Sequence, residues 1–292
     1  MPDFMTSTLD TNGVLYVVAT PIGNLDDMVP RAIAVLQSVD HIAAEDTRKS
    51  IHLLKHFAID TPLVAYHDQS DERRRKHLIG LLVKGKSIAL ISDAGTPLIS
   101  DPGYQLVRSA RRVGAKIIPI PGACALITAL STAGLPSDRF IFEGFLPPKA
   151  HARQQLLKQL ALESRTVIFY ESTHRLLAAL QDMKTVLGGD RTVVLARELT
   201  KIFETIIEAP LEELINQLQA DTNQQKGEIV LLVKGYQRPQ QVDELDPKAQ
   251  QTLTVLLQEL PLKQAVNIAA KLTGVKKRCL YQWAVNRVDS AG

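Results

Sequence analysis

Residues 14–24 read VLYVVATPIGN, an apolar run that ends in a turn. The run from Val14 to Ala19 carries no charge and is typical of a strand buried inside a sheet. Pro21 and Gly23 interrupt it, because both residues favour turns over strands. Asn24 is placed to cap a helix whose apolar side chains recur at helical spacing, at Leu25, Met28, Val29, Ala32, Ile33 and Leu36. The stretch therefore predicts a strand, a tight turn and a helix, the repeating unit of α/β proteins.

The same succession continues along the chain. In the first half we expect strands at 42–44, 88–91 and 116–120, and a helix over 106–113 that Gly114 stops. A second series is expected after Pro147 and Pro148, with strands at 166–170, 191–196 and 228–233 and helices at 176–187 and 211–219. Strands that alternate with helices favour an α/β fold.

A chain of 292 residues is too long for one average domain. We expect a first α/β domain over 1–121 and a second over 122–236. Residues 237–248 are polar and contain two prolines, so they are interpreted as a linker. Residues 249–292 have a helical pattern throughout. The predicted organisation is two α/β domains followed by a helical extension.

Composition excludes several classes of protein. The net charge of +3 does not by itself indicate a nucleic-acid partner. Cys124 and Cys279 lie far apart without a Cys or His companion, which argues against structural zinc and disulfides and is typical of a reducing cytoplasm. No stretch approaches the roughly 20 apolar residues that span a bilayer, and residues 1–12 lack the apolar run of a signal peptide. We expect a cytoplasmic protein that binds neither a metal nor a membrane.

Three loops rich in glycine and proline follow predicted strands: TPIGN at 20–24, SDAGTP at 92–97 and PGACA at 121–125. In open α/β sheets, ligands bind at the carboxyl ends of the strands, where loop backbones and helix N-termini offer free N–H groups. None of the loops matches G-x-G-x-x-G or a P-loop, which disfavours dinucleotides and nucleoside triphosphates. Glycine and proline also simply punctuate turns, but three such loops on one edge favour a ligand site.

These loops carry a resemblance to a known family. Residues 15–25, the AEDTR run at 44–48 and SDAGTPLISDPG at 92–103 resemble the tetrapyrrole methylase superfamily. Within it they resemble the branch that 2′-O-methylates a cytidine of 16S ribosomal RNA, and FYESTHR at 169–175 and ARELTK at 196–201 are similar to that branch too. The first loop lacks the G-x-G-x-G-D form of the members that act on small molecules, which argues against a porphyrin or corrin substrate.

The resemblance implies a two-domain fold that holds S-adenosylmethionine between the domains, in a homodimer that acts on 16S ribosomal RNA, within the small ribosomal subunit. It also implies later cofactor contacts near Glu171. The residues it maps to the cofactor are Pro21, Gly23, Asp93, Ala94, Gly95, Thr96, Ile99, Cys124 and Ala125.

Methyl transfer from a sulfonium is an in-line displacement, so alignment and exclusion of water are the main tasks of the protein. A ribose 2′-OH attacks poorly while it is protonated, so a proton acceptor is expected nearby. The reaction requires no metal. Position in the predicted loops leaves several candidates for the catalytic residues open: Asp46, Asp93, Glu171, His174 and Lys201.

Basic residues are candidates for RNA contacts. Arg48, Arg175, Arg197 and Lys201 could bind phosphate, although surface ion pairs explain them nearly as well. Residues 262–285 have the spacing of a helix-turn-helix. In that segment small Ala269 and Ala270 allow two helices to cross closely, Gly274 supplies the turn, and Trp283 is expected to pack in the core. The second helix would open with the RNA-contact candidates Lys276, Lys277 and Arg278.

Three functional hypotheses follow. The favoured one is a methyltransferase that uses S-adenosylmethionine to modify the ribose of a 16S ribosomal RNA cytidine. The second is a methylase of a tetrapyrrole ring, which would need an apolar trough and no basic tail. The third is a regulator that binds nucleic acid and senses S-adenosylmethionine without catalysis.

Overall fold

The structure is a computed structural model, which describes residues 12–67, 72–237 and 245–288. The chain divides into two compact units, Met1–Tyr236 and Gln237–Gly292. Among the described residues, the first unit contains two five-stranded sheets and the second contains three helices. Within the described ranges, no helix is both long and apolar enough to cross a membrane.

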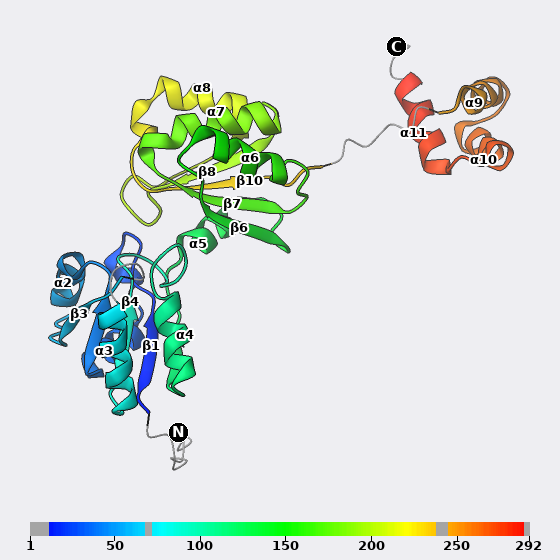
Figure 1. The fold of residues 1–292 in the computed structure, drawn as a ribbon. Helices are drawn as coiled ribbons and strands as arrows, with labels where there is room; N and C mark the ends of the chain where they lie inside the picture. The colour runs from blue at the N-terminus through cyan, green and yellow to red at the C-terminus, as the bar shows by residue number, and fades with distance from the viewer. Residues whose placement is uncertain (1–11, 68–71, 238–244, 289–292) are drawn as a thin grey trace. The chain divides into compact units, whose positions relative to one another are not determined.

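The first sheet is parallel throughout and has the strand order β3-β2-β4-β1-β5. Helices α1 and α2 pack on one face and helices α3 and α4 on the other (Figure 1). Because all five strands run the same way, their carboxyl ends share one edge. The strands are β1 (Val14–Val18), β2 (His41–Ala44), β3 (Leu63–Ala65), β4 (Ile88–Ile91) and β5 (Lys116–Ile120). The helices are α1 (Pro30–Ser38), α2 (Thr47–His56), α3 (Glu72–Val83) and α4 (Tyr104–Arg112).

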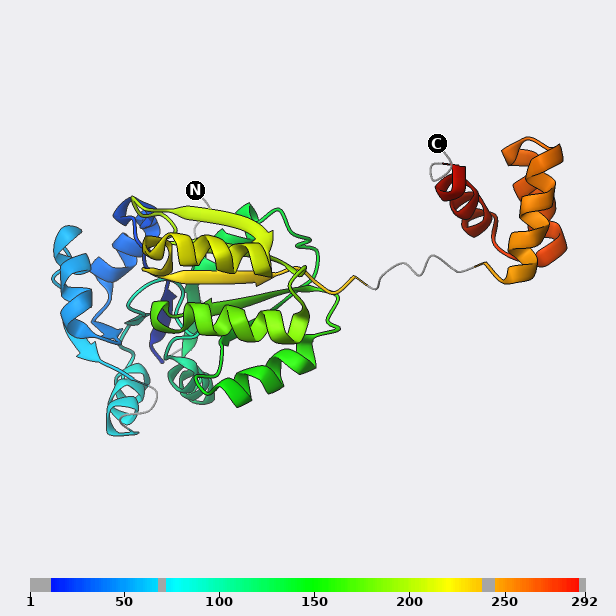
Figure 2. The same ribbon diagram turned by 90° about the horizontal axis from the view of Figure 1, so that it is seen from above.

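The second sheet is mixed and has the order β6-β7-β10-β8-β9. Only β6 and β7 pair in parallel, and β10 runs antiparallel to both of its neighbours. Helices α6, α7 and α8 cover one face, while α5 packs on the other, towards the first sheet (Figures 1 and 2). The strands are β6 (Phe140–Phe145), β7 (Thr166–Glu171), β8 (Thr192–Arg197), β9 (Thr205–Pro210) and β10 (Ile229–Val233). The helices are α5 (Ala125–Thr132), α6 (Ala150–Leu160), α7 (Leu176–Leu187) and α8 (Leu211–Ala220).

All the strands expected from the sequence are present, but two expectations for the first unit are wrong. Asn24 caps a short 3-10 helix over Leu25–Asp27, and the longer helix begins only at Pro30. Proline keeps the residue before it extended, as Val29 is, and is itself well suited to the first helical position. The second series of elements begins with β6, before Pro147. The sequence did not indicate this strand, because Glu143 and Gly144 interrupt its apolar residues and leave only a short apolar run.

The C-terminal unit consists of α9 (Pro247–Glu259), α10 (Leu262–Thr273) and α11 (Lys277–Val288). Gly274 ends α10 in the left-handed conformation, with φ of 73°, and so supplies the expected turn. Ala269 is fully buried and Trp283 packs against the core, as expected. The predicted linker 237–248 is too long, because α9 already begins at Pro247. Residues 238–244 of it lie outside the described residues. The predicted boundary between residues 121 and 122 stays a prediction.

Candidate active site

The three glycine and proline loops meet at one edge, as expected. They follow β1, β4 and β5, which are neighbours in the first sheet. The main chains of Thr20 and Gly95 exchange two hydrogen bonds, of 2.9 and 3.0 Å. The Thr96 hydroxyl donates to the carbonyl oxygen of Ala123 at 3.0 Å, which joins the second loop to the third. Because each loop is bonded to another, the edge is a fixed surface.

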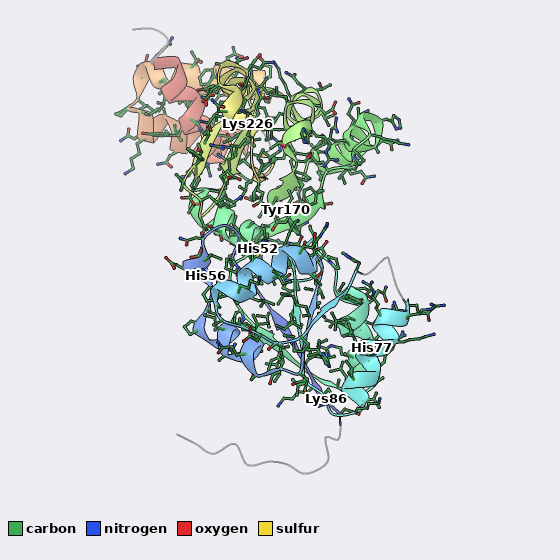
Figure 3. The ribbon with its side chains drawn as sticks, turned by 90° about the vertical axis from the view of Figure 1, so that its left-hand side faces the viewer. His52, His56, His77, Lys86, Tyr170 and Lys226 are labelled. Carbon is green, nitrogen blue, oxygen red and sulfur yellow. The ribbon has the colours of Figure 1, made fainter. Side chains whose placement is uncertain are left out.

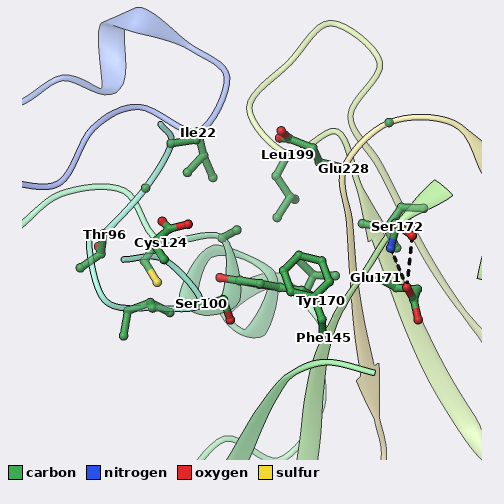
Figure 4. A pocket seen from close by; sticks show the side chains of 18 of the residues that line it. Ile22, Thr96, Ser100, Cys124, Phe145, Tyr170, Glu171, Ser172, Leu199 and Glu228 are labelled. Carbon is green, nitrogen blue, oxygen red and sulfur yellow. Dashed lines mark hydrogen bonds between the residues drawn. The ribbon is translucent and has the colours of Figure 1, made fainter. Parts of the chain in front are cut away.

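A cavity of about 380 Å³ lies between this edge and the second sheet (Figure 4). Its volume is that of a small-molecule site. The first sheet's loops and the start of α5 form one side, with Ile22, Ala94, Gly95, Thr96, Ile99, Ser100, Asp101, Cys124 and Ala125. The second sheet and its loops form the other, with Phe145, Tyr170, Glu171, Ser172, Thr173, Leu199 and residues 227–230.

The residues that the resemblance maps to the cofactor divide between two neighbouring cavities. The larger cavity is lined by Ala94, Gly95, Thr96, Ile99, Cys124 and Ala125. A second one, of about 310 Å³, is lined by Pro21, Gly23 and Asp93 together with Lys201 and His52. The two cavities share Ile22, Ala94 and Glu228 in their walls. Figure 3 shows His52 and Tyr170 where the two halves of the first unit meet, with Lys86 at the far end of the first sheet.

Strained backbone surrounds the larger cavity. Leu98 and Ser100 in one loop, and Glu198 and Thr200 in another, have positive φ although none is glycine. Each such residue costs roughly 1–3 kcal/mol and is tolerated where the surrounding structure or the function requires it. Gly227 also has positive φ, and a Cβ there would lie 2.4 Å from Glu198 Oε1. The chain therefore stores strain at this cavity, which is typical of a functional site.

Asp101 is the carboxylate in the cavity wall whose protonation is most altered. Burial raises the pKa of Asp101 to about 6, helped by the negative charges of Glu45 and Asp93 and opposed by a hydrogen bond from Ser92. Burial, followed by the charge of Asp93, also raises the pKa of Glu45. Sequence reasoning did not select Asp101, although it lies within the quoted SDAGTPLISDPG string. Only the fold shows that it is half-buried near two other acids.

Tyr170 is a second residue that sequence reasoning missed. Its hydroxyl oxygen accepts a hydrogen bond from the Leu126 N–H at 3.1 Å, in the first turn of α5. Its ring lies edge-on to Phe142 and Phe145, with ring centroids 4.9 and 5.6 Å away. Burial is the main cause that raises the pKa of Tyr170, so the hydroxyl stays protonated. Tyr170 thus joins the second sheet to the start of α5, directly after Cys124 and the third loop (Figure 4).

Glu171 lines the cavity, but its carboxylate is directed away from the centre (Figure 4). Side chains alternate along a strand, so Glu171 shares the far face of β7 with Phe169 and not the face of Tyr170. The side chain is fully buried, and its Oε1 accepts from the Ser172 N–H at 2.7 Å and pairs with Arg175 at 2.8 Å. Its Oε2 is buried and has no hydrogen-bond partner in the part of the chain that the structure describes. The geometry does not favour Glu171 as the proton acceptor.

Three other candidates for catalysis lie outside the larger cavity. Asp46 caps α2, accepts from the Arg48 N–H at 2.9 Å and pairs with the Arg48 side chain at 3.0 Å. His174 is exposed in a 3-10 turn after β7. Lys201 lines the smaller cavity and pairs with Glu198 and Glu228 at 2.9 and 3.0 Å.

The basic residues expected to contact RNA in the first unit differ in accessibility. Arg48 is exposed, and its ion pair among the described residues is with Asp46 at the surface, where solvent screens the attraction. Arg175 is half-buried against Glu171. Arg197 is 7% exposed and donates to the carbonyl oxygens of Lys226 and Phe203, at 3.1 and 3.0 Å. The position of Arg197 does not support the predicted RNA contact, because its guanidinium is used to hold two loops together.

No group of three or more His, Cys, Asp or Glu side chains is placed to hold a metal ion, as far as the described ranges extend. Lys49 instead neutralises part of the acidic loop, since its Nζ donates to Asp93 Oδ2 at 2.7 Å. The other oxygen of Asp93 accepts from the Asp46 N–H at 3.0 Å. The carboxylate of Asp93 therefore ties the start of α2 to the second loop.

Comparison with known proteins gives consistent results. Residues 14–215 match the family described as Tetrapyrrole (Corrin/Porphyrin) Methylases, and residues 243–287 match the RsmI C-terminal HTH domain. The ribosomal RNA small subunit methyltransferase I of Pseudomonas aeruginosa is 56% identical over 94% of this chain and 98% of its own length. The protein of the same name from Escherichia coli O157:H7 is 54% identical over 95% of this chain and 96% of its own.

Solved structures show the same fold at much lower identity. The methyltransferase CobJ has a TM-score of 0.58 at 19% identity, and the match covers 77% of this chain and 96% of that one. Uroporphyrin-III-C-methyltransferase from Thermus thermophilus has a TM-score of 0.54 at 18% identity, over 76% and 94% of the two chains. At this identity the likeness supports the fold alone. The two α/β halves, the ligand-sized cavity between them and the full-length relatives lead to one conclusion: the chain belongs to the tetrapyrrole methylase family and, within it, to the group of ribosomal RNA small subunit methyltransferase I.

Proposed function

We propose that this protein transfers a methyl group from S-adenosylmethionine to the ribose 2′-oxygen of a cytidine in 16S ribosomal RNA. The observation that carries the proposal is the cavity at the strand ends, in a chain that matches ribosomal RNA methyltransferases over nearly all its length. The proposal includes assembly as a homodimer, a cytoplasmic location and action on the small ribosomal subunit, all of which the family resemblance implies.

The residues of the larger cavity fit S-adenosylmethionine. Ile22, Ile99 and Leu199 offer apolar surface for the adenine and ribose carbons. The carboxylate of Asp101 offers negative potential for the sulfonium. Thr200 Oγ1, beside Gly23 in the wall of the neighbouring smaller cavity, is buried and has no hydrogen-bond partner among the described residues, as expected where a polar ligand group is to be bound. When bound, the cofactor supplies a methyl group on a good leaving group.

Asp101 is the proposed proton acceptor. The bound cofactor would supply the methyl carbon to the ribose oxygen and its sulfur would leave with the bonding electrons, while the Asp101 carboxylate would take the hydroxyl proton. A carboxylate with a pKa of about 6 is ionised at neutral pH and is a stronger base than an ordinary aspartate. Tyr170 is a positioning residue, because it fixes the first turn of α5 through Leu126.

The RNA contacts are proposed to lie largely in the C-terminal unit. Residues 237–292 contain eight Lys and Arg against five Asp and Glu, a net charge of +3 that equals the net charge of the whole chain. The first unit is therefore neutral overall, and the attraction for a phosphate backbone is concentrated in the helices. Lys276, Lys277 and Arg278 are exposed there, as a phosphate contact requires.

A transfer assay with labelled cofactor tests the proposal. The purified protein is incubated in parallel with small ribosomal subunits, bare 16S ribosomal RNA and a porphyrin precursor. Label in RNA that is retained on the 2′-oxygen of a cytidine after nuclease digestion is the expected result. Label in the porphyrin would support a tetrapyrrole methylase instead, and cofactor binding without transfer to any substrate would support a sensor.

Replacing Asp93 by Ala is expected to weaken binding of S-adenosylmethionine about tenfold. The change removes both the bond to the Asp46 N–H and the ion pair with Lys49, so the second loop is no longer tied to α2. Isothermal calorimetry measures the affinity. Asp93→Asn is the matched variant, since it keeps an acceptor for the N–H and should be weakened less. Unchanged affinity in Asp93→Ala would contradict the role.

A further inference from the structure

The C-terminal unit has an open groove between α10 and α11. It is lined by Pro261, Leu262, Lys263, Val266, Asn267, Lys277, Arg278, Tyr281, Gln282 and Val285. On α11 the groove residues Lys277, Tyr281 and Val285 follow at intervals of four, so they form one stripe along the helix. Leu280 and Ala284, which pack in the core, lie on a different stripe. The groove is therefore a surface separate from the packing face of α11.

The charge of this groove has one sign. Three of its ten lining residues are basic, Lys263 on α10 and Lys277 and Arg278 on α11, and none is acidic. All three are exposed, and among the described residues none of them makes an ion pair. Cations on both walls of a groove match a ligand that carries negative charge along its length, as a nucleic-acid backbone does.

Tyr281 adds an aromatic surface between these cations. Its side chain is half exposed, with an exposed fraction of 50%, and it lines the groove beside Val266 and Val285. Trp283, the other aromatic residue described in this unit, packs against the core instead. An exposed ring flanked by lysine and arginine is the arrangement on which unpaired bases stack, because every base has an aromatic face.

We propose that this groove binds a single-stranded segment of RNA, with phosphates on Lys263, Lys277 and Arg278 and one base stacked on Tyr281. The inference rests on the proposed function, which makes RNA the substrate, and extends it to a particular face of the C-terminal unit. A duplex would leave Tyr281 without a partner, since its bases are already stacked and offer no free face. The groove thus selects a loop or an unpaired region of the RNA.

Fluorescence anisotropy on the full-length protein tests the inference, with a short single-stranded oligoribonucleotide and a duplex of the same sequence as probes. Tyr281→Ala is expected to weaken single-strand binding about tenfold, and Tyr281→Phe to bind nearly as the wild type does, because the ring remains. Lys277→Gln combined with Arg278→Gln should reduce the slope of log affinity against log salt by about 1.4, at roughly 0.7 for each phosphate that the protein no longer neutralises.

Lys271→Gln is the matched control, since Lys271 is exposed on α10 but does not line the groove. Its effect should be clearly smaller than that of the double variant. Three results would overturn the inference: unchanged binding in Tyr281→Ala, an equally weakened affinity in Lys271→Gln, or tighter binding of the duplex. The assay needs no methyl transfer. If single-strand binding depends on Tyr281 while no RNA is ever labelled, the groove stands and the proposed function fails.

Discussion

Asp101→Asn is expected to lower the rate of methyl transfer to RNA by about a hundredfold or more, because general bases typically contribute that much to a proton transfer. The amide is similar in size to the carboxylate but cannot accept the proton of the ribose hydroxyl. Binding of S-adenosylmethionine should weaken far less, since one neutral side chain replaces one of several groups in the wall. Single-turnover transfer at saturating cofactor measures the first effect and calorimetry the second.

The pH dependence provides an independent check on the same residue. The wild-type rate should rise as pH increases through about 6, where Asp101 loses its proton, and this rise should be absent from the residual activity of Asp101→Asn. Asp190→Asn is the control, because Asp190 is an exposed carboxylate in the turn before β8. A wild-type rate that stays flat between pH 5 and 7.5, or an Asn variant with full activity, would contradict the assignment.

The raised pKa also has a consequence for stability. A carboxyl group whose pKa is higher in the folded state than its ordinary 3.8 destabilises the fold once it ionises. The penalty is absent below about pH 4 and complete above about pH 6. Asp101→Asn should therefore be more stable than the wild type at pH 7.5, by about 1–2 kcal/mol since solvent partly screens the group, and equally stable at pH 4. Thermal unfolding at the two pH values measures the difference.

Removal of residues 238–292 is expected to lower kcat/KM for the ribosomal substrate by about a hundredfold or more, with almost no change in affinity for S-adenosylmethionine. The cofactor cavity lies wholly in the first unit, while the net positive charge lies in the removed part. The cut keeps Tyr236, whose N–H donates to the Glu163 carbonyl at 2.6 Å and whose ring lies 5.4 Å from the Arg191 guanidinium. The second sheet should therefore stay folded.

Circular dichroism and cofactor calorimetry establish that the truncated protein is folded before transfer is measured. The matched control is the full-length protein at high salt, which should approach the truncated protein in its KM for RNA because salt screens the same charge. Equal reductions of cofactor affinity and transfer in a folded truncation would contradict this division between the two units. So would a truncation that transfers methyl groups at the wild-type rate.

The elements that the sequence predicted well are those with uninterrupted apolar runs. Residues 88–91 are a strand at the expected bounds, because a strand covered by helices on both faces is apolar throughout. Residues 116–120 are also a strand at the expected bounds, although Lys116 and Pro119 are exposed in this edge strand. The strand Thr205–Pro210 was not predicted, since it lies at the edge of the second sheet and alternates exposed with half-buried residues. No helix was expected at residues 47–56, yet they form α2, in which Ser50 and Leu54 are the buried residues.

The positions of the loops that form the site could be predicted from the sequence. The protonation and orientation of its side chains could not, because they depend on residues that are distant in sequence but close in the fold. Glycine and proline at 20–24, 92–97 and 121–125 placed three loops on one edge, and the parallel sheet confirms that placement. The altered protonation of Asp101 results from burial beside Glu45, which lies more than 50 positions away in sequence. The side chain of Glu171 points away from the cavity because it lies on the same face of β7 as Phe169. The sequence around residues 169–171 does not indicate which face of the strand borders the cavity.

The order of the strands in the second sheet also limits when this protein can become active during synthesis. The last strand of the first unit, β10, is inserted between β7 and β8 and carries Ile229 and Val230 into the cavity wall, opposite Ile22 near the start of the chain. A nascent chain that lacks β10 has neither a complete sheet nor a closed wall. An unfinished copy emerging from the ribosome should therefore be unable to hold its methyl donor, so incomplete translation products would stay inert.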